Sequence, residues 1–177
     1  KDFDSIPKQL FMKNYDIIIS YMSPWIVPEE VLNVTKLWNI NFHPGPPSYP
    51  GIGCFNFAIY NSENTYGVTA HIMKSKVDTG EIIGVNRFPM NDDETVITLS
   101  KKSYASQLLL YKKIIKSIKE KNILPTTNEE WTRKPYKRSE LEELSTITEK
   151  MDIEEVEKRI RSTYYPGKPS PFIKFFN

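Results

Sequence analysis

The segment at 41–55, NFHPGPPSYPGIGCF, restricts the fold more than any other part of this sequence, because it holds four prolines and three glycines. Proline fixes φ and lacks an N–H donor, so neither a helix interior nor a central strand can run through it. KLWNINF at 36–42 has the pattern of a strand, and CFNFAIYN at 54–61 has that of a helix. We therefore expect a stiff loop between strand and helix, with His43 at its start.

The rest of the chain mixes strand and helix patterns. YDIIISYM at 15–22 is an apolar, β-branched run, which is typical of a buried parallel strand. Parallel strands need crossover connections, so we expect an α/β fold with a mostly parallel sheet. Residues 1–125 are expected to form the main domain, and 126–177 a small C-terminal α+β appendage. The other expected elements are strands at 66–77 and 81–90, helices after Pro28, from near Thr95 to near Asn122, after Ser139 and at 153–162, and an edge strand at the C-terminus.

Charge and cysteine content exclude some classes of partner and compartment. The net charge of +2 is too small to favour a nucleic acid or an anionic membrane, and no apolar run approaches the length of a membrane span. One cysteine, Cys54, cannot form an internal disulfide. A reducing compartment follows, and we predict a cytoplasmic location.

Asn41 and His43 are two residues apart at the end of the 36–42 strand, so their side chains should point the same way. In open α/β sheets, ligands bind at the carboxyl ends of the strands. The prolines stiffen the loop that follows, and Gly45, Gly51 and Gly53 allow tight turns. A preorganised site and a rigid connection with a hydrogen-bonded surface histidine are equally compatible with this stretch.

A second polar cluster lies in VTAHIMKSKVDTGEI. Asp78 near His43 would orient the imidazole and raise its pKa, although Asp-x-Gly is also ordinary turn chemistry. His71 fits best as a hydrogen-bonded strand histidine. A metal site formed by His43, His71 and Asp78 is disfavoured, because the sequence has no H-x-H, H-x-x-x-H or E-x-x-H spacing and no spare cysteine. No metal is therefore expected.

Together, NFHPGPPSYPGIG and YGVTAHIMKSKVDTGEII resemble the signature of the 10-formyltetrahydrofolate-dependent formyltransferases. That signature is Asn-x-His-Pro, a Pro/Gly loop, Gly-x-Thr-x-His and Asp-x-Gly, in this order. The resemblance covers roughly residues 15–120. RIRSTYYPGKPSPFIKF also resembles the segment after the catalytic domain in the sugar and tRNA enzymes. The resemblance implies a Rossmann-like formyltransferase fold.

The resemblance also implies roles for single residues. Asn41, His43 and Asp78 would be catalytic: the amide donates to the oxyanion, the imidazole moves the proton, and the carboxylate holds the imidazole. The co-substrate would be 10-formyltetrahydrofolate, without a metal. Cys54 is expected to pack rather than act as a nucleophile. The pterin slot would be formed by Met22, Ser23, Trp25, Ile26 and Val27 with Asp78, and the supporting residues by His71, Gly45, Tyr49, Gly51 and Gly53.

Among acceptors, a primary amine of a nucleotide-linked amino sugar is favoured by HPGPPSYPGIG and by PGKPSPFI near the C-terminus. Methionyl-tRNA and glycinamide ribonucleotide are the alternatives within the family. A non-catalytic folate- or nucleotide-binding module is the alternative of another class.

Family members usually begin with a further βαβ portion, which we expect this chain to lack. DIII at 16–19 offers consecutive bulky β-branched residues, which in a parallel sheet predicts neighbours on both flanks. The sequence supplies a neighbour on one flank, the 36–42 strand. We therefore expect the second neighbour to come from outside these residues or from a second chain, as in a homodimer.

Overall fold

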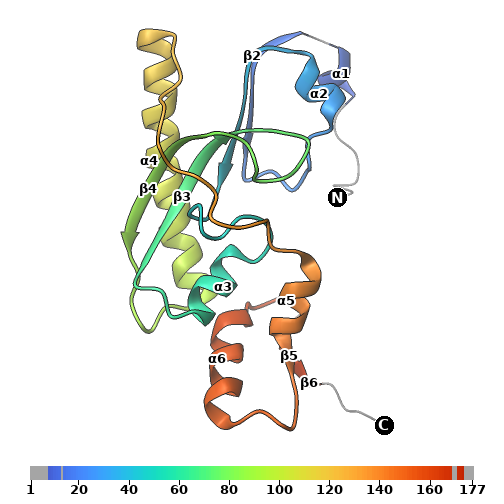
Figure 1. The fold of residues 1–177 in the computed structure, drawn as a ribbon, viewed down its shortest axis with the longest axis vertical. Coiled ribbons are helices and arrows are strands. Elements are labelled where there is room, and N and C mark those ends of the chain that lie inside the picture. The colour runs from blue at the N-terminus through green and yellow to red at the C-terminus, as the bar shows by residue number, and fades with distance from the viewer. Residues whose placement is uncertain (1–7, 13, 169–170, 174–177) are drawn as a thin grey trace.

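A computed structural model describes residues 8–12, 14–168 and 171–173 (Figure 1). Its sheet has the order β1-β2-β3-β4, in which β1 and β2 are parallel and the other two pairs are antiparallel. The α/β class is confirmed, but the expectation of a mostly parallel sheet is wrong for the described strands. Strands β3 and β4 form a hairpin around the connection 73–81, which holds no helix, whereas parallel strands need a long crossover. The four strands are β1 Tyr15–Tyr21, β2 Thr35–His43, β3 Thr65–Ile72 and β4 Ile82–Pro89.

Strand β1 pairs with β2 alone among the described strands. Ile18 is buried, but Ile19 is 36% exposed, so the expectation of a strand covered on both faces is only partly met. A further strand beside β1 stays a prediction. Strand β3 ends at Ile72, earlier than expected, and the chain from 73 to 80 continues as irregular structure and turns.

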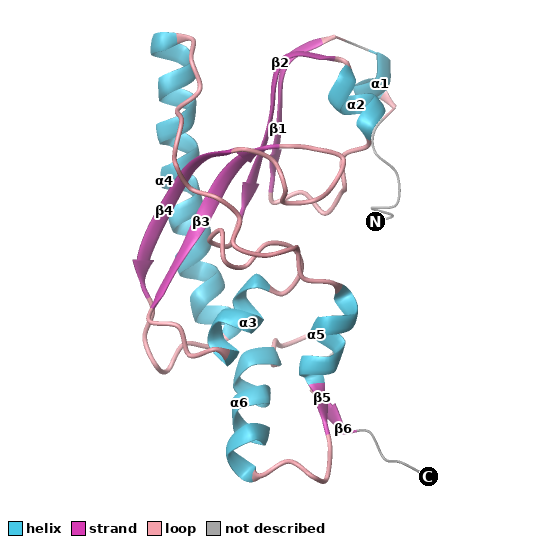
Figure 2. Cartoon of the chain, in the orientation of Figure 1, coloured by secondary structure: helices cyan, strands magenta, loops and turns pink. Residues whose placement is uncertain are grey.

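The helices lie close to the expected positions (Figure 2). The long helix α4 begins after Thr95, whose hydroxyl accepts from Thr98 N, and ends at Asn122 in the left-handed conformation, with φ 51°. Helix α3 follows the Pro/Gly loop, as expected. The helices are α1 Gln9–Met12, α2 Glu29–Asn33, α3 Cys54–Tyr60, α4 Val96–Lys121, α5 Arg138–Ser145 and α6 Ile153–Thr163. No helix in the described ranges is both long and apolar enough to cross a membrane.

Two apolar clusters hold the sheet to the helices. One lies between the sheet and α4 and includes Ile40, Phe42 and Ile114. The other surrounds α3 and includes Phe57 and Tyr66. Helix α4 packs against β2, β3 and β4 and so supports the strand ends that carry the candidate site (Figure 1).

The C-terminal region packs against the rest of the protein by means of helix α6, which contacts α3. The Asn56 amide donates to Ser162 O at 2.7 Å, and the Tyr60 hydroxyl donates to Glu155 at 2.8 Å. The region also contains the short parallel pair β5 Thr146–Ile147 and β6 Phe172–Ile173. The division of the chain at 125/126 stays a prediction, and many contacts cross it.

Candidate active site

Strands β2 and β3 meet through the carboxyl-terminal part of each, because Ile40–His43 pairs with Thr69–Ile72. This register places Asn41 directly opposite His71 and His43 opposite Thr69. The two polar clusters of the sequence therefore meet at one point of the sheet, as their strand-end positions predicted.

The Pro/Gly loop is mostly buried, and several of its carbonyl groups have donors. Ser103 Oγ donates to Pro44 O at 2.8 Å, and Thr69 Oγ1 donates to Gly45 O at 2.7 Å. Buried backbone oxygens without donors would be costly, so these bonds explain how the loop can lie inside the protein. Further donors reach Pro46 O from Tyr49 N, Pro47 O from Thr132 N and Pro50 O from Tyr136 N.

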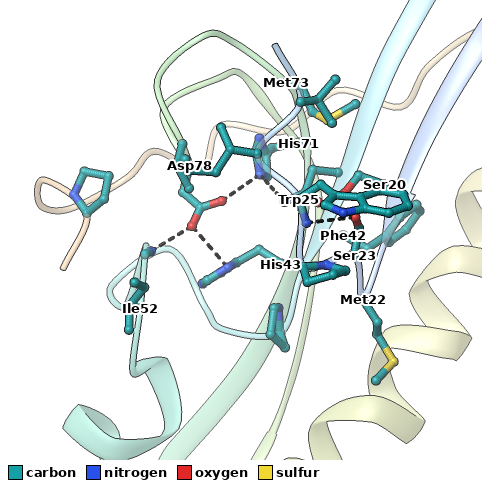
Figure 3. A pocket seen from close by; sticks show the side chains of 18 of the residues that line it. Ser20, Met22, Ser23, Trp25, Phe42, His43, Ile52, His71, Met73 and Asp78 are labelled. Atoms are coloured by element: carbon teal, nitrogen blue, oxygen red, sulfur yellow. Dashed lines mark hydrogen bonds and ion pairs between the residues drawn. The ribbon is translucent and has the colours of Figure 1, made fainter. Parts of the chain in front are cut away.

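Asp78 lies between the two histidines (Figure 3). Its Oδ2 is 3.2 Å from His43 Nδ1, and its Oδ1 is 3.1 Å from His71 Nε2. Gly51 N also donates to Oδ2, at 2.7 Å. All three side chains are at most 6% exposed, and Asp78 adopts the left-handed backbone conformation with φ 47°. The expected convergence of Asp78 with His43 is therefore present as a direct contact.

Each imidazole has one nitrogen on a backbone carbonyl. His43 Nε2 is 2.8 Å from Tyr49 O, and His71 Nδ1 is 2.9 Å from Ile72 O. A carbonyl can only accept, so both of these nitrogens carry protons. The other nitrogen of each ring, His43 Nδ1 or His71 Nε2, is then the one that can gain or lose a proton, and both of these nitrogens face Asp78.

Asn41 joins the cluster through His71. Its Nδ2 is 3.0 Å from His71 Nε2, the same nitrogen that lies 3.1 Å from Asp78 Oδ1. Asn41 also lines the adjoining cavity. His71 thus does more than the hydrogen-bonded strand histidine that the sequence favoured, because it links Asn41 to Asp78.

Burial and the neighbouring charges set the protonation of the cluster. Burial by itself would raise the pKa of Asp78, but His43, His71 and the Gly51 N–H outweigh it and hold that pKa at about 2. Burial lowers the pKa of His43, and Asp78 and the Tyr49 carbonyl offset only part of this effect. Asp78 raises the pKa of His43, as expected, but burial outweighs this effect, so the net pKa of His43 is lowered. At neutral pH, the carboxylate is ionised and the His43 imidazole is neutral.

A cavity of about 660 Å³ opens beside this cluster. Every residue that was expected in the pterin slot lines it, at the end of β1: Met22, Ser23, Trp25, Ile26 and Val27. Met22 has the left-handed backbone conformation, with φ 51°, and is 54% exposed. A long apolar side chain rarely adopts this conformation without a local constraint. Trp25 and Met22 lie on one side of His43, and Ile52 lies on the other (Figure 3).

Several lining residues were not expected from the sequence. Tyr104 comes from α4, and Pro135, Tyr136 and Arg138 come from the polar stretch before and at the start of α5. The aromatic and proline residues in WTRKPY were the signal in that stretch, because a solvated linker seldom needs them. The remaining unexpected lining residues are Ser20, Pro24, Phe42, Pro44, Ile52, Met73, Lys74 and Val77.

The supporting residues hold the loop in place. A Cβ on Gly45 would lie 2.6 Å from His43 Nε2, and one on Gly51, with φ 85°, would lie 2.5 Å from Tyr136 O. Gly53 is the N-cap of α3. Tyr49 presents its carbonyl to His43 and donates its hydroxyl to Glu63 at 2.6 Å.

Cys54 is buried beside the loop, and burial raises the pKa of its thiol to about 12. A protonated thiol is a poor nucleophile, which agrees with the expected packing role. No group of three or more His, Cys, Asp or Glu side chains in the described residues is placed to hold a metal ion.

The formyl transferase family model matches residues 5–114. The bifunctional polymyxin resistance protein ArnA of Wigglesworthia glossinidia brevipalpis is 35% identical over 108 residues, which are 60% of this chain and 16% of that protein. The methionyl-tRNA formyltransferase of Dictyoglomus thermophilum is 28% identical over 163 residues, 86% of this chain and 51% of that protein. The chain therefore spans about half or less of the length of these relatives.

Solved structures share the fold. A sugar N-formyltransferase from Shewanella sp FDAARGOS_354 superposes with a TM-score of 0.78 at 18% identity, over 98% of this chain and 70% of the other. The N-formyltransferase of Helicobacter canadensis, solved with folinic acid and dTDP-3-aminofucose, has a TM-score of 0.70 at 23% identity, over 89% of this chain and 58% of the other. At such identities the likeness establishes the fold.

Proposed function

Because the chain belongs to the formyl transferase family, we propose that it transfers a formyl group from 10-formyltetrahydrofolate to a primary amine of a nucleotide-linked amino sugar. The observation that carries this proposal is the buried cluster of Asn41, His43 and Asp78 at the edge of one cavity. The family signature contains these three residue types, and the cavity gives substrates access to them.

In the proposed reaction, the amine nitrogen attacks the formyl carbon, and an oxyanion forms at the former carbonyl oxygen. The amide of Asn41 donates to that oxyanion, a type of contact whose loss typically costs about 3–4 kcal/mol. His43 takes the proton that the amine loses, and the carbon–nitrogen bond to folate N10 then breaks as N10 gains a proton. The products are the N-formyl amine and tetrahydrofolate.

The neutral imidazole of His43 carries its proton on Nε2, which donates to Tyr49 O at 2.8 Å. Its Nδ1, 3.2 Å from Asp78 Oδ2, therefore has the lone pair that can take the proton of the amine. We assign the amine a position next to Nδ1, where Asp78 stabilises the imidazolium that forms.

The end of β1 is the proposed binding wall for the pterin. It offers the indole of Trp25 and the apolar side chains of Ile26 and Val27, with polar backbone groups nearby. A flat heterocycle needs an apolar wall and a few fixed polar groups. The folinic acid in the Helicobacter canadensis structure supports a folate as the donor.

Two cations on the cavity favour an anionic acceptor. Lys74 and Arg138 both line it, and neither has an ion pair within the described part of the chain. A diphosphate would supply the missing negative charge. The dTDP-3-aminofucose in the Helicobacter canadensis structure supports this choice. A cytoplasmic location accords with a folate-dependent reaction and remains part of the proposal.

The test is a formyl-transfer assay with 10-formyltetrahydrofolate and three kinds of acceptor: nucleotide-linked amino sugars, glycinamide ribonucleotide and methionyl-tRNA. We expect turnover with an amino sugar, and a strongly reduced rate in His43→Asn. Transfer only to tRNA or to glycinamide ribonucleotide would show that the proposed acceptor is wrong, whereas the proposed formyl transfer would stand. Folate binding without transfer to any of the three would contradict catalysis and favour a binding module.

A further inference from the structure

Residues 127–138, here called the clamp segment, connect both loops of the candidate site. Thr127 Oγ1 donates to Ile82 O at 3.0 Å, which fixes the start of the segment to β4. Its end is fixed to the Pro/Gly loop, where Tyr136 N donates to Pro50 O at 2.9 Å and Ile52 N donates to Tyr136 O at 3.2 Å. The clamp segment therefore spans from the strand after Asp78 to the loop after His43.

Trp131 lies in the middle of the clamp segment, against both histidines. Its ring centre is 5.1 Å from that of His71 and 5.9 Å from that of His43, and both contacts are edge-to-face. Its Nε1 donates to Gly80 O at 2.8 Å, which holds the Asp-x-Gly turn. Trp131 thus touches both imidazoles and fixes the turn that carries the carboxylate between them.

The far end of the clamp segment is fastened by stacked side chains. Tyr136 stacks on Phe57 of α3 with ring centres 3.7 Å apart, and the guanidinium carbon of Arg133 lies 3.1 Å from the centre of the Tyr136 ring. Arg133 also pairs with Glu140 at 3.0 Å. These contacts leave Trp131 little freedom to move relative to the loop.

We propose that Trp131 is a positioning residue, which holds His43, His71 and Asp78 in register by packing on both imidazoles and bonding the Gly80 carbonyl. Its ring contacts and its hydrogen bond reach the two histidines and the Asp-x-Gly turn, which belong to the catalytic side of the cavity. Its loss should therefore lower the rate of the chemical step and leave folate binding nearly unchanged. The catalytic consequence rests on the proposed function, whereas the effect on the imidazoles does not.

Three variants test the proposal: Trp131→Leu, Trp131→Phe and the matched control Trp38→Leu. Trp38 belongs to β2 and packs in the cluster beside α4, so its loss removes a similar indole away from the histidines. The readouts are kcat, the KM for the folate donor, thermal stability and the ¹⁵N spectrum of the imidazoles. The spectrum is specific to the site, because the chain has two histidines and both belong to the cluster.

We expect Trp131→Leu to lower kcat about 10- to 100-fold, since small misplacements of catalytic groups have effects of this size. The KM for folate should stay within about threefold, and the imidazole signals of both histidines should shift. Trp131→Phe keeps a ring but loses the bond to Gly80, so its loss of kcat should be smaller. Trp38→Leu should lower the melting temperature without moving the imidazole signals or kcat.

Unshifted imidazole signals in Trp131→Leu would overturn the proposal, and so would an equal loss of kcat in Trp38→Leu. If Trp131→Leu does not fold, Trp131→Phe decides by the same spectrum. If the wild-type protein transfers no formyl group, the proposed function fails, but the imidazole spectra still report whether Trp131 positions the cluster.

Discussion

The two walls of the cavity differ in how completely the protein itself organises them. The wall at 43–53 is mostly buried, and four of its carbonyls, those of Pro44, Gly45, Pro47 and Pro50, have donors from α4, β3 or the clamp segment. The wall at 22–27 is half-buried or exposed, with Ile26 at 70% and Met22 at 54%. A wall that is fixed without a ligand suits catalysis, and an open wall of apolar side chains suits binding. We therefore expect the wall at 43–53 to determine the rate of formyl transfer and the wall at 22–27 to determine the affinity for folate.

The largest effect is expected from His43→Asn. Removing a general base typically costs about 10²- to 10⁴-fold in rate, so kcat should fall within this range. The dissociation constant of a folate should change by less than about twofold, because the residue lies on the catalytic wall. Single-turnover kinetics and a folate titration separate the two, and a variant that retained most of its turnover would disprove the acid–base role.

Asp78→Asn should have the next largest effect, about 10²-fold in kcat, through loss of the charge that stabilises the imidazolium. It should also change acid stability. The pKa of Asp78 is lowered from 3.8 to about 2 on folding, so its contribution is present above pH 4 and lost as the pH falls toward 2. That contribution is on the order of 2 kcal/mol, and urea unfolding between pH 2 and 5 measures it.

The pH dependence of stability should show a second, separate step due to His43. Burial lowers its pKa below the ordinary 6.5, so the folded state binds its proton less readily than the unfolded chain. The stabilisation is complete above pH 6.5 and declines as the pH falls below it. In His43→Asn this upper step should be absent, and the step of Asp78 should become smaller, because His43 is one of the groups that lower the pKa of Asp78. An unchanged profile above pH 5 would show that His43 is not held neutral by burial.

On the open wall, Trp25→Ala should weaken folate binding about tenfold, which corresponds to the loss of about 1–2 kcal/mol of apolar contact. The rate at saturating folate should stay close to that of the wild-type protein. If the rate at saturation fell instead and affinity did not change, the two walls would not have separate roles. Isothermal titration with folinic acid, together with kcat, distinguishes these results.

Ile26→Ser is expected to have the smallest effect. The side chain is 70% exposed, so the free energy of unfolding should change by less than about 0.5 kcal/mol. Folate affinity should fall only two- to threefold, because a small part of the apolar wall is lost. A loss of affinity larger than that of Trp25→Ala would place the pterin on a different part of the wall.

The sequence predicted local features better than pairing. Helix α4 was predicted to within a residue or two because residues that favour helix ends stand at both of its ends. Thr95 caps its start, and Asn122 adopts the left-handed conformation at its end. Strand direction was not predicted correctly. Apolar runs look alike in parallel and antiparallel pairs, and the antiparallel pairing of β2 with β3 depends on a register that no local pattern encodes.

The candidate site was predicted from the order of its motifs, and the structure brings Asn41, His43 and Asp78 together. The link from Asn41 to His71 and the clamp segment were missed. The contact of Asn41 with His71 depends on two residues that face each other across neighbouring strands. The position of the clamp segment depends on Trp131, which contacts Gly80, a residue distant in sequence. The net lowering of the pKa of His43 was also missed, because the motif shows the neighbouring carboxylate but not how deeply the imidazole is buried.

Hydrogen–deuterium exchange with and without folinic acid tests the division between the two walls most directly. The account predicts that the ligand slows exchange of backbone amides at 22–27, and that exchange at 43–53 is slow both with and without it. The opposite pattern, with 43–53 exchanging rapidly until the folate binds and 22–27 unaffected, would contradict the account.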